Sequence, residues 1–450
     1  MFVPRILKGN NLMKKKIPAR VIALLLAILM SFSLILSGCD SGHFINTDKT
    51  GNTDTSAAEQ ESVYSKIDIL IALIKNFSYY KLDDEQIYSS LIHGFTGIAG
   101  DRYAEYYSAE NFEKLTAENS GDSQGIGITV IFDADTGYIQ VLTVLPGSPA
   151  EKAGLMPDDR ITHIGIGENA VSTAELGYTE AVNRLQGKAG TEAEFTVKRG
   201  ESEDKIEFKV LREHFESQSV MYHVCNTDNK VKVGIVKLTQ FDLTTPGQFC
   251  EAMDALIAAG CNEFIFDVRY NGGGDLASIT AVLSYMLNSN DVLIKTKDRD
   301  GNETVTKVAA VNYSSASPYS ACNVKEEDIA KYRPYVEGKS AVLVNGNTAS
   351  AAELFTIGLK DYGISVIVGT KTYGKGSMQS IIPLANYGSS GALKLTTKMY
   401  FPPISDGYDG KGITPDVTVE LDEMLTNKNI YKITDEEDNQ LQAAITSIGN

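Results

Sequence analysis

The stretch GTKTYGKGSMQ, residues 369–379, has the spacing of a phosphate-binding loop but not its surroundings. Gly369, Gly374 and Lys375 match the pattern G-x-x-x-x-G-K-[ST], in which the final hydroxyl binds Mg²⁺. That final position is Gly376 here. A phosphate loop also leads directly into a helix, whereas the following SMQSIIPL has the composition of a strand. The stretch therefore excludes a nucleotide-binding α/β fold of this type and leaves Lys375 in need of another role.

Strand-like and helix-like runs alternate around this stretch, over residues 213–425. The strand-like runs are VKVGIVKL, EFIFDVRY, SAVLVN and ISVIVG, and the helix-like runs are TTPGQFCEAMDALIAAG, DLASITAVLSYML and SAAELFTIGLKDYG. Such alternation is typical of parallel strands joined by crossover helices. We predict an α/β domain over 213–425, followed by a polar, peripheral tail over 426–450.

Two further segments of this domain place chemistry at a junction of strand and helix. In FDVRYNGGGDL, residues 266–276, three glycines would let backbone amides face a developing negative charge, or would simply form a tight turn. In NGNTASAAELF, residues 345–355, Ser350 lies at the start of a helix, where the amide of Ala351 is free to donate. Ser350 is thus either a nucleophile or an ordinary N-cap.

A nucleophilic serine needs a base, and Lys375 is a candidate if burial keeps its amine neutral. In an extended strand Lys375, Ser377 and Gln379 would point the same way, so that Gln379 could accept a hydrogen bond from the amine. The alternative base is a histidine, His214 or His223. The G-x-S-x-G motif that accompanies many histidine bases is absent.

Residues 120–212 form a separate β-rich module. Its order is strand, strand, short helix, strand, helix, strand, strand, and the phrase GSPAEKAGLMPDDRI together with GIGI resembles a PDZ domain of the rearranged bacterial type. The resemblance implies that GIGI captures a peptide's C-terminal carboxylate on its backbone amides, while the next strand offers an edge for the peptide. The residues of this loop are Gly125, Ile126, Gly127 and Ile128.

Taken in order, these motifs resemble the C-terminal processing peptidases, also called tail-specific proteases. NTASAAE resembles the family's nucleophile segment, with Ser350 as the nucleophile, and TYGKGSMQ resembles its T-x-G-K-G-x-x-Q segment, with Lys375 and Gln379. RYNGGG resembles R-x-N-x-G-G, which implies an oxyanion hole formed by the amides of Gly273 and Ala351.

Two shorter matches extend the resemblance over residues 62–422. DRYAEYYS, residues 101–108, resembles D-P-Y-S-x-Y, and Gly412 to Asp416 read GITPD. The resemblance implies a catalytic core of the crotonase/ClpP-like type. One departure is LQGKAGT, where Gln186 stands in the place of an arginine that the family associates with coupling peptide binding to activation; Arg184 is a possible substitute.

The N-terminus resembles a bacterial lipoprotein signal, over residues 1–38. A basic segment and an apolar run lead to L-S-G-C, in which Cys39 is the lipidation site; Met13 opens a second potential start, MKKK. The alternative is a retained signal anchor with an incidental cysteine. Residues 39–62 have the composition of a flexible tether. We expect an exported protein, lipid-anchored to the outer face of the bacterial cytoplasmic membrane.

The next segment, residues 63–119, is expected to be helical because its apolar residues recur at helical spacing. Such a stripe is usually core packing, and it is also a possible homodimer contact.

The formal net charge of the 450-residue chain, −17, argues against a nucleic-acid partner. We expect polypeptide substrates with accessible apolar C-termini.

The cysteines and histidines point to no metal site and no cofactor. Export would permit disulfides among the four cysteines that follow the signal. Cys250 and Cys261, near opposite ends of one expected helix, would lie about 16 Å apart, too far to bridge. Every other pairing among Cys225, Cys250, Cys261 and Cys322 stays open.

The sequence as a whole predicts a membrane-anchored serine endopeptidase that uses Ser350, Lys375 and Gln379 and recognises substrate C-termini through its PDZ domain. The alternative is a PDZ-bearing scaffold lipoprotein without catalytic activity.

Overall fold

The computed structural model describes residues 63–78, 83–98, 100–133, 136–200, 204–227, 231–314, 321–426 and 428–448. The chain divides into two units, Met1–Tyr79 and Tyr80–Asn450. The signal segment, Cys39 and the tether to residue 62 lie outside the described residues. Within the described ranges, no helix combines the length and hydropathy needed to cross a bilayer.

The described part of the first unit is one helix, α2 (Val63–Phe77). Large apolar side chains on it are exposed to solvent: Ile69, Leu70, Leu73, Ile74 and Phe77. The second unit begins with α3 (Asp84–Ile98), β1 (Glu105–Tyr107) and α4 (Ala109–Ser120). The helical expectation for 63–119 thus missed β1, which forms because its backbone pairs with a strand almost 300 residues later, Glu105 opposite Lys394.

The β-rich module is a sheet of six strands with a helix packed against it. Its order is β3-β4-β5-β7-β8, and β6 pairs with β5. The strands are β3 (Ile128–Asp133), β4 (Tyr138–Val144), β5 (Arg160–Ile164), β6 (Val171–Ser172), β7 (Glu192–Lys198) and β8 (Lys205–Leu211). The helices are α5 (Pro149–Lys152) and α6 (Thr173–Leu185), and a ribbon of β2 (Asp122–Gly125) and β9 (Glu213–Glu216) connects the module to the rest of the unit.

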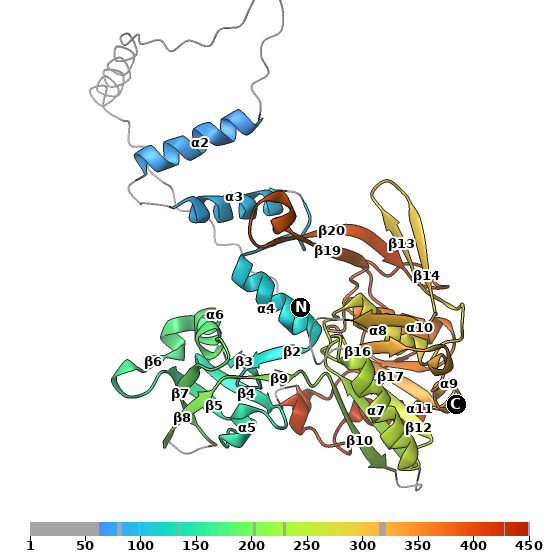
Figure 1. Ribbon diagram of the computed structural model, residues 1–450. Coiled ribbons are helices and arrows are strands. Elements are labelled where there is room, and N and C mark those ends of the chain that lie inside the picture. The colour runs from blue at the N-terminus through green and yellow to red at the C-terminus, as the bar shows by residue number, and fades with distance from the viewer. Residues whose placement is uncertain are drawn as a thin grey trace, which may run out of the picture. The chain divides into compact units, whose positions relative to one another are not determined.

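The central sheet of the α/β domain has the order β10-β11-β12-β17-β18-β21, and Figure 1 labels β10, β12 and β17 of this sheet. Its strands are β10 (Val220–Asn226), β11 (Lys232–Leu238), β12 (Glu263–Asp267), β17 (Ser340–Val344), β18 (Val366–Gly369) and β21 (Val417–Thr418). All neighbours pair in parallel except β10 and β11. This confirms the parallel α/β arrangement that the alternating runs predict.

Helices cover both faces of this sheet. The helices are α7 (Thr245–Ala258), α8 (Leu276–Ser284), α9 (Arg333–Val336), α10 (Ala351–Asp361) and α11 (Asn439–Ser447). Successive side chains of a strand point to opposite faces. Phe264 and Phe266 therefore join the large core formed with α7, α8 and α10, whereas Ile265 joins a smaller core with Leu441 of α11.

A second sheet lies beside the first and carries part of the site. Its order is β1-β20-β13-β14, with β19 also pairing with β20. The strands are β13 (Val292–Asp298), β14 (Glu303–Lys307), β19 (Ser377–Pro383) and β20 (Ala392–Phe401), and β15 (Val311–Ser314) and β16 (Ala321–Val324) form a separate hairpin. Because β19 is a strand, the stretch after Lys375 has no helix of the kind a phosphate loop requires.

The C-terminal segment is not the peripheral tail that its polar composition predicted. Helix α11 packs against β17 and β18, and Asp438 at its N-terminus forms a buried ion pair with Arg269 (2.7 Å). Upstream, Asn429 Nδ2 donates to the backbone oxygen of Leu142 in the β-rich module (2.8 Å), and Lys432 pairs with Asp158 there. Buried hydrogen-bonding groups help to hold this segment in place, and a count of apolar residues does not reveal them.

Three cysteines, Cys225, Cys250 and Cys261, carry free thiols. The expectation that Cys250 and Cys261 do not bridge is confirmed. The side chain of Cys322 lies outside the described residues.

Candidate active site

Three loops of the α/β domain meet at one edge of the central sheet. They follow β12, β17 and β18, which are neighbouring parallel strands. The carboxyl ends of parallel strands share one edge, which is where ligands bind in open α/β sheets. The three segments that the sequence singled out, containing Gly273, Ser350 and Lys375, are these loops.

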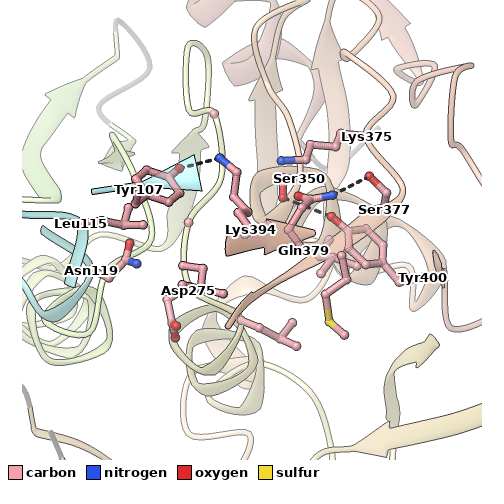
Figure 2. Close-up of a pocket in the computed structure, with 17 residues that line it drawn as sticks. Tyr107, Leu115, Asn119, Asp275, Ser350, Lys375, Ser377, Gln379, Lys394 and Tyr400 are labelled. Carbon is pink, nitrogen blue, oxygen red and sulfur yellow. Dashed lines mark hydrogen bonds between the residues drawn. The ribbon is translucent and has the colours of Figure 1, made fainter. Parts of the chain in front are cut away.

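A cavity of about 340 Å³ opens between these loops and the second sheet. Figure 2 shows the side chains of Ser350, Lys375, Gln379 and Tyr400 converging on it. The other lining residues are Tyr107, Leu115, Asn119, Gly272, Gly274, Asp275, Leu276, Ala351, Leu354, Ser377, Met378, Ile381 and Lys394. The predicted nucleophile and the predicted base thus face the same space.

Ser350 is held in a backbone conformation that side chains rarely adopt. Its φ is 57° and its ψ is −120°, and such a strained residue costs on the order of 1–3 kcal/mol and is frequent at active sites. Its hydroxyl lies 3.1 Å from the hydroxyl of Tyr400, and either group can donate. In the described part of the chain no hydrogen bond joins Ser350 Oγ to Lys375 Nζ.

A fully buried carboxylate, Glu353, ties the serine loop to the lysine loop. Its Oε2 accepts from the backbone N–H of Ser350 (3.0 Å) and of Lys375 (2.8 Å). Its Oε1 accepts from the N–H of Gly374 (2.7 Å) and from the hydroxyl of Thr372 (2.5 Å). One side chain thereby fixes the separation of the two reactive residues.

The surroundings of Lys375 favour the neutral amine. Burial lowers the pKa of Lys375, and the nearby cations Lys394 and Arg102 act in the same direction, whereas the Glu353 carboxylate opposes them. Its Nζ also lies 4.6 Å from the centre of the Tyr103 ring, a contact that favours the charged form. The direction of the pKa shift is the one that a lysine base requires.

Gln379 lines the same cavity, but among the described residues no hydrogen bond joins it to Lys375 of the kind that the alternation of an extended strand predicted. Its Nε2 donates to the hydroxyls of Ser377 and Thr396 (3.0 Å each). A β-bulge between Met378 and Gln379 breaks the alternation, and Lys375 lies before the strand begins. The two donated bonds leave Gln379 Oε1 as the atom that could accept from an amine.

The glycine-rich loop lies against Ser350, with one amide already engaged. A Cβ on Gly273 would come within 2.7 Å of Ser350 Cβ, so only glycine allows this approach. The Gly273 N–H donates to Asn271 Oδ1 (2.9 Å) and is therefore not free for an oxyanion in this arrangement. Ala351 is the first residue of α10. The first amides of a helix have no acceptor within that helix, so the Ala351 N–H remains available.

The glycines around Lys375 serve packing of the backbone rather than phosphate binding. A Cβ on Gly374 would lie 2.6 Å from the backbone nitrogen of Gly412, and one on Gly376 would lie 2.7 Å from Asp409 Cβ. The Gly376 N–H also donates to Asp409 Oδ1 (2.8 Å). The loop therefore lies directly against the segment that contains GITPD.

The β-rich module has a groove of its own between β3 and α6, about 350 Å³ in volume. The predicted loop residues Gly125, Ile126, Gly127 and Ile128 form one end, and Tyr178, Val182 and Leu185 of α6 form a wall. This is where a strand-like peptide would add to the edge of β3.

Near the end of α6, the structure points to an arginine that sequence reasoning missed. Gln186 lines the groove, but Arg184 is paired with Glu180 on its own helix (2.7 Å). The buried Arg212 donates instead to the backbone oxygens of Leu185 and Arg184 (3.0 and 2.7 Å). It binds the carboxyl end of α6 to the start of β9.

The histidines lie away from the cavity and have carboxylate partners elsewhere. His214 lies 3.0 Å from Asp122 in the β2–β9 ribbon, and His223 lies 2.9 Å from Asp435. Neither lines the cavity that contains Ser350. A histidine base is therefore not favoured.

Comparison with known proteins identifies two domains in this chain. Residues 232–419 match peptidase family S41, and residues 140–199 match a PDZ domain. A probable CtpA-like serine protease of Staphylococcus aureus strain N315 is 29% identical over 401 residues, 88% of this chain and 73% of that protein. A carboxy-terminal-processing protease of Bartonella bacilliformis is 27% identical over 405 residues, covering 89% and 82%.

A solved structure shares the fold. It is a putative S41 protease from Bacteroides fragilis, which is 17% identical, has a TM-score of 0.53, and aligns over 88% of this chain and 98% of its own. Residues 232–419 are thus a peptidase family S41 domain, and the chain is a serine-type peptidase that also carries a PDZ domain.

Proposed function

We propose that this peptidase cleaves exported polypeptides near their C-termini by means of a Ser350–Lys375 pair. The observation that carries the proposal is the shared cavity of Ser350 and Lys375, whose backbones one buried carboxylate holds together. The similarity to the carboxy-terminal-processing protease of Bartonella supports the choice of substrate end.

In the proposed mechanism Ser350 Oγ attacks the scissile carbonyl while neutral Lys375 takes its proton. The same lysine then returns the proton to the leaving amine. The lowered pKa of Lys375, caused first by burial, supports this role because it increases the neutral fraction at a given pH. Gln379 orients the lysine through Oε1 once substrate closes the cavity.

The Ala351 amide stabilises the oxyanion in this proposal, and the Gly273 amide joins it only after leaving Asn271 Oδ1. Removing one such donor costs about 10²–10³ in kcat in comparable sites. The parallel order of β11, β12, β17 and β18 agrees with a core of the crotonase/ClpP-like type, which we retain as part of the proposal.

The PDZ domain is proposed to hold the substrate's C-terminus on the Gly125–Ile128 loop, with apolar side chains against α6. The groove beside β3 supports this, because its wall contains Val182 and Leu185. Arg212, at the junction of α6 and β9, is the residue through which occupancy of the groove would reach the catalytic domain.

We further propose that Cys39 carries a lipid that anchors the protein to the outer face of the bacterial cytoplasmic membrane. The support is the L-S-G-C sequence after a basic and apolar segment.

A homodimer through the N-terminal helices is a second proposal, supported by the exposed apolar side chains of α2.

The decisive experiment compares four forms of the purified full chain in detergent on labelled casein: wild type, Ser350→Ala, Lys375→Ala, and a double variant in which His214 and His223 are alanine. Wild type and the histidine variant should degrade casein at similar rates, and the other two should be inactive. Equal inactivity of wild type and Ser350→Ala on many unfolded chains would favour the alternative, a PDZ scaffold without catalytic activity.

A further inference from the structure

Tyr400 is a buried residue at the nucleophile with no role in the mechanism above. Its hydroxyl lies 3.1 Å from Ser350 Oγ, and its side chain lines the cavity although the residue is only 4% exposed. It comes from β20 of the second sheet, and its N–H donates to the backbone oxygen of Gly376 in the lysine loop (2.9 Å). The hydroxyl is therefore held in position relative to both Ser350 and Lys375.

The surroundings of Tyr400 favour the protonated phenol. Burial raises its pKa well above the usual value, with the carboxylates of Glu353 and Asp409 acting in the same direction and the hydrogen bond with Ser350 opposing it. When Lys375 has taken the proton of Ser350, the serine oxygen offers only lone pairs. Tyr400 is then the donor of the hydrogen bond between them.

Of the two amides proposed for the oxyanion hole, one is already engaged. The Gly273 amide is bound to Asn271 Oδ1, whereas the amide of Ala351 is free. The oxyanion and Ser350 Oγ become bonded to the same carbon, so a donor within reach of one oxygen is close to the other. A tyrosine hydroxyl can take the place of a backbone amide in such a site.

We infer that Tyr400 is a catalytic residue whose hydroxyl donates a hydrogen bond to the negative charge that develops when Ser350 attacks. The inference rests on the proposed function of Ser350 and Lys375. In the step, the bond between Ser350 Oγ and the carbonyl carbon forms and the carbonyl π pair moves to its oxygen. The serine proton passes to Lys375, and Tyr400 keeps its own proton throughout.

A matched pair of variants isolates this hydroxyl. Tyr400→Phe removes it and keeps the ring. Tyr408→Phe is the control, because Tyr408 is equally buried, its ring lies 6.4 Å from that of Tyr400, and its hydroxyl has no hydrogen-bond partner among the described residues.

The experiment measures kcat and KM on labelled casein and the rate at which a fluorophosphonate probe labels Ser350, using the full chain. Tyr400→Phe should lower kcat and the labelling rate by about 100-fold, the loss expected for one donor, while KM stays within about threefold. Tyr408→Phe should match wild type in all three. Thermal unfolding of both variants establishes that each is folded.

A Tyr400→Phe enzyme within about threefold of wild type would overturn the inference. A Tyr400→Phe enzyme that is faster than wild type would also overturn it, because the Tyr400–Ser350 hydrogen bond would then hold back the attack by Ser350. Loss of activity in both phenylalanine variants, with lowered thermal stability, would assign Tyr400 to packing alone. Failure of the proposed function is distinct: wild type would then resemble Ser350→Ala, with no cleavage and no labelling.

Discussion

Replacing Glu353 by glutamine should weaken both the fold and the chemistry, because four donors converge on its carboxylate. Each oxygen accepts two hydrogen bonds, and Glu353 is fully buried. The amide of Glu353→Gln can keep one pair, but its NH₂ group faces the other two donors. Two bonds to a charged acceptor are lost, at about 1.5–3 kcal/mol each, so the free energy of unfolding should fall by about 3–6 kcal/mol.

The assay is thermal unfolding monitored by calorimetry, combined with casein cleavage at a temperature at which the variant is folded. The loss corresponds to a fall of about 6–24 °C in the unfolding midpoint for a domain of this size. The serine and lysine loops also lose their common anchor, and a misplacement of about 1 Å lowers kcat by about 100-fold.

The control is Glu303→Gln, at a carboxylate that is 70% exposed and pairs with Lys297 on the surface. It should change stability by less than about 1 kcal/mol. If Glu353→Gln were as stable and as active as Glu303→Gln, the argument that the carboxylate holds the two loops together would be wrong.

Three more predictions concern the surroundings of the site. Lys394→Met should move the midpoint of the pH–rate profile upward: the Lys394 cation lowers the pKa of Lys375, so without it a higher pH is needed to populate the neutral base. Asp438→Asn should destabilise the domain by about 3 kcal/mol in urea unfolding, because it removes a charged partner of the buried Arg269. Gly376→Ala should lower kcat without changing peptide affinity of the PDZ domain measured by calorimetry, since its Cβ would lie 2.7 Å from a neighbouring Cβ.

Each of these variants has a control elsewhere in the same domain. Lys307→Met changes an exposed lysine on β14 and should leave the pH profile in place. Asp300→Asn is the control for Asp438→Asn, because it alters a carboxylate that is 71% exposed. Gly247→Ala adds a Cβ that would meet no atom within 4 Å. Effects of similar size in a control and its partner would contradict the corresponding prediction.

The meeting of Ser350 and Lys375 could be predicted from the sequence because both follow strands of one parallel sheet. Strands of such a sheet place their carboxyl ends together, so a strand-by-strand assignment is enough. The position of Glu353 was also accessible, since a serine followed three residues later by glutamate is typical of a helix N-terminus.

Other features had no local signal in the sequence. Tyr400 reaches Ser350 from a different sheet, and the pairing of β19 with β20 that brings it there is a long-range property. The bulge beside Gln379 breaks the alternation that placed its amide near the lysine. In the C-terminal segment, Leu441 and Ala444 are buried in an apolar cluster with residues of the central sheet, but polar residues precede them in the chain, so the composition indicated a peripheral tail.

The packing of the C-terminal segment bears on the proposed cleavage of polypeptides near their C-termini. A peptidase needs the substrate backbone to be extended in its cavity. Helix α11 offers no extended backbone while Leu441 and Ala444 remain packed and Asp438 remains paired with Arg269. Cleavage of this segment by a second copy would require the sheet to be uncovered first. The helix that completes this core would thus also keep the segment out of the cavity of a second copy.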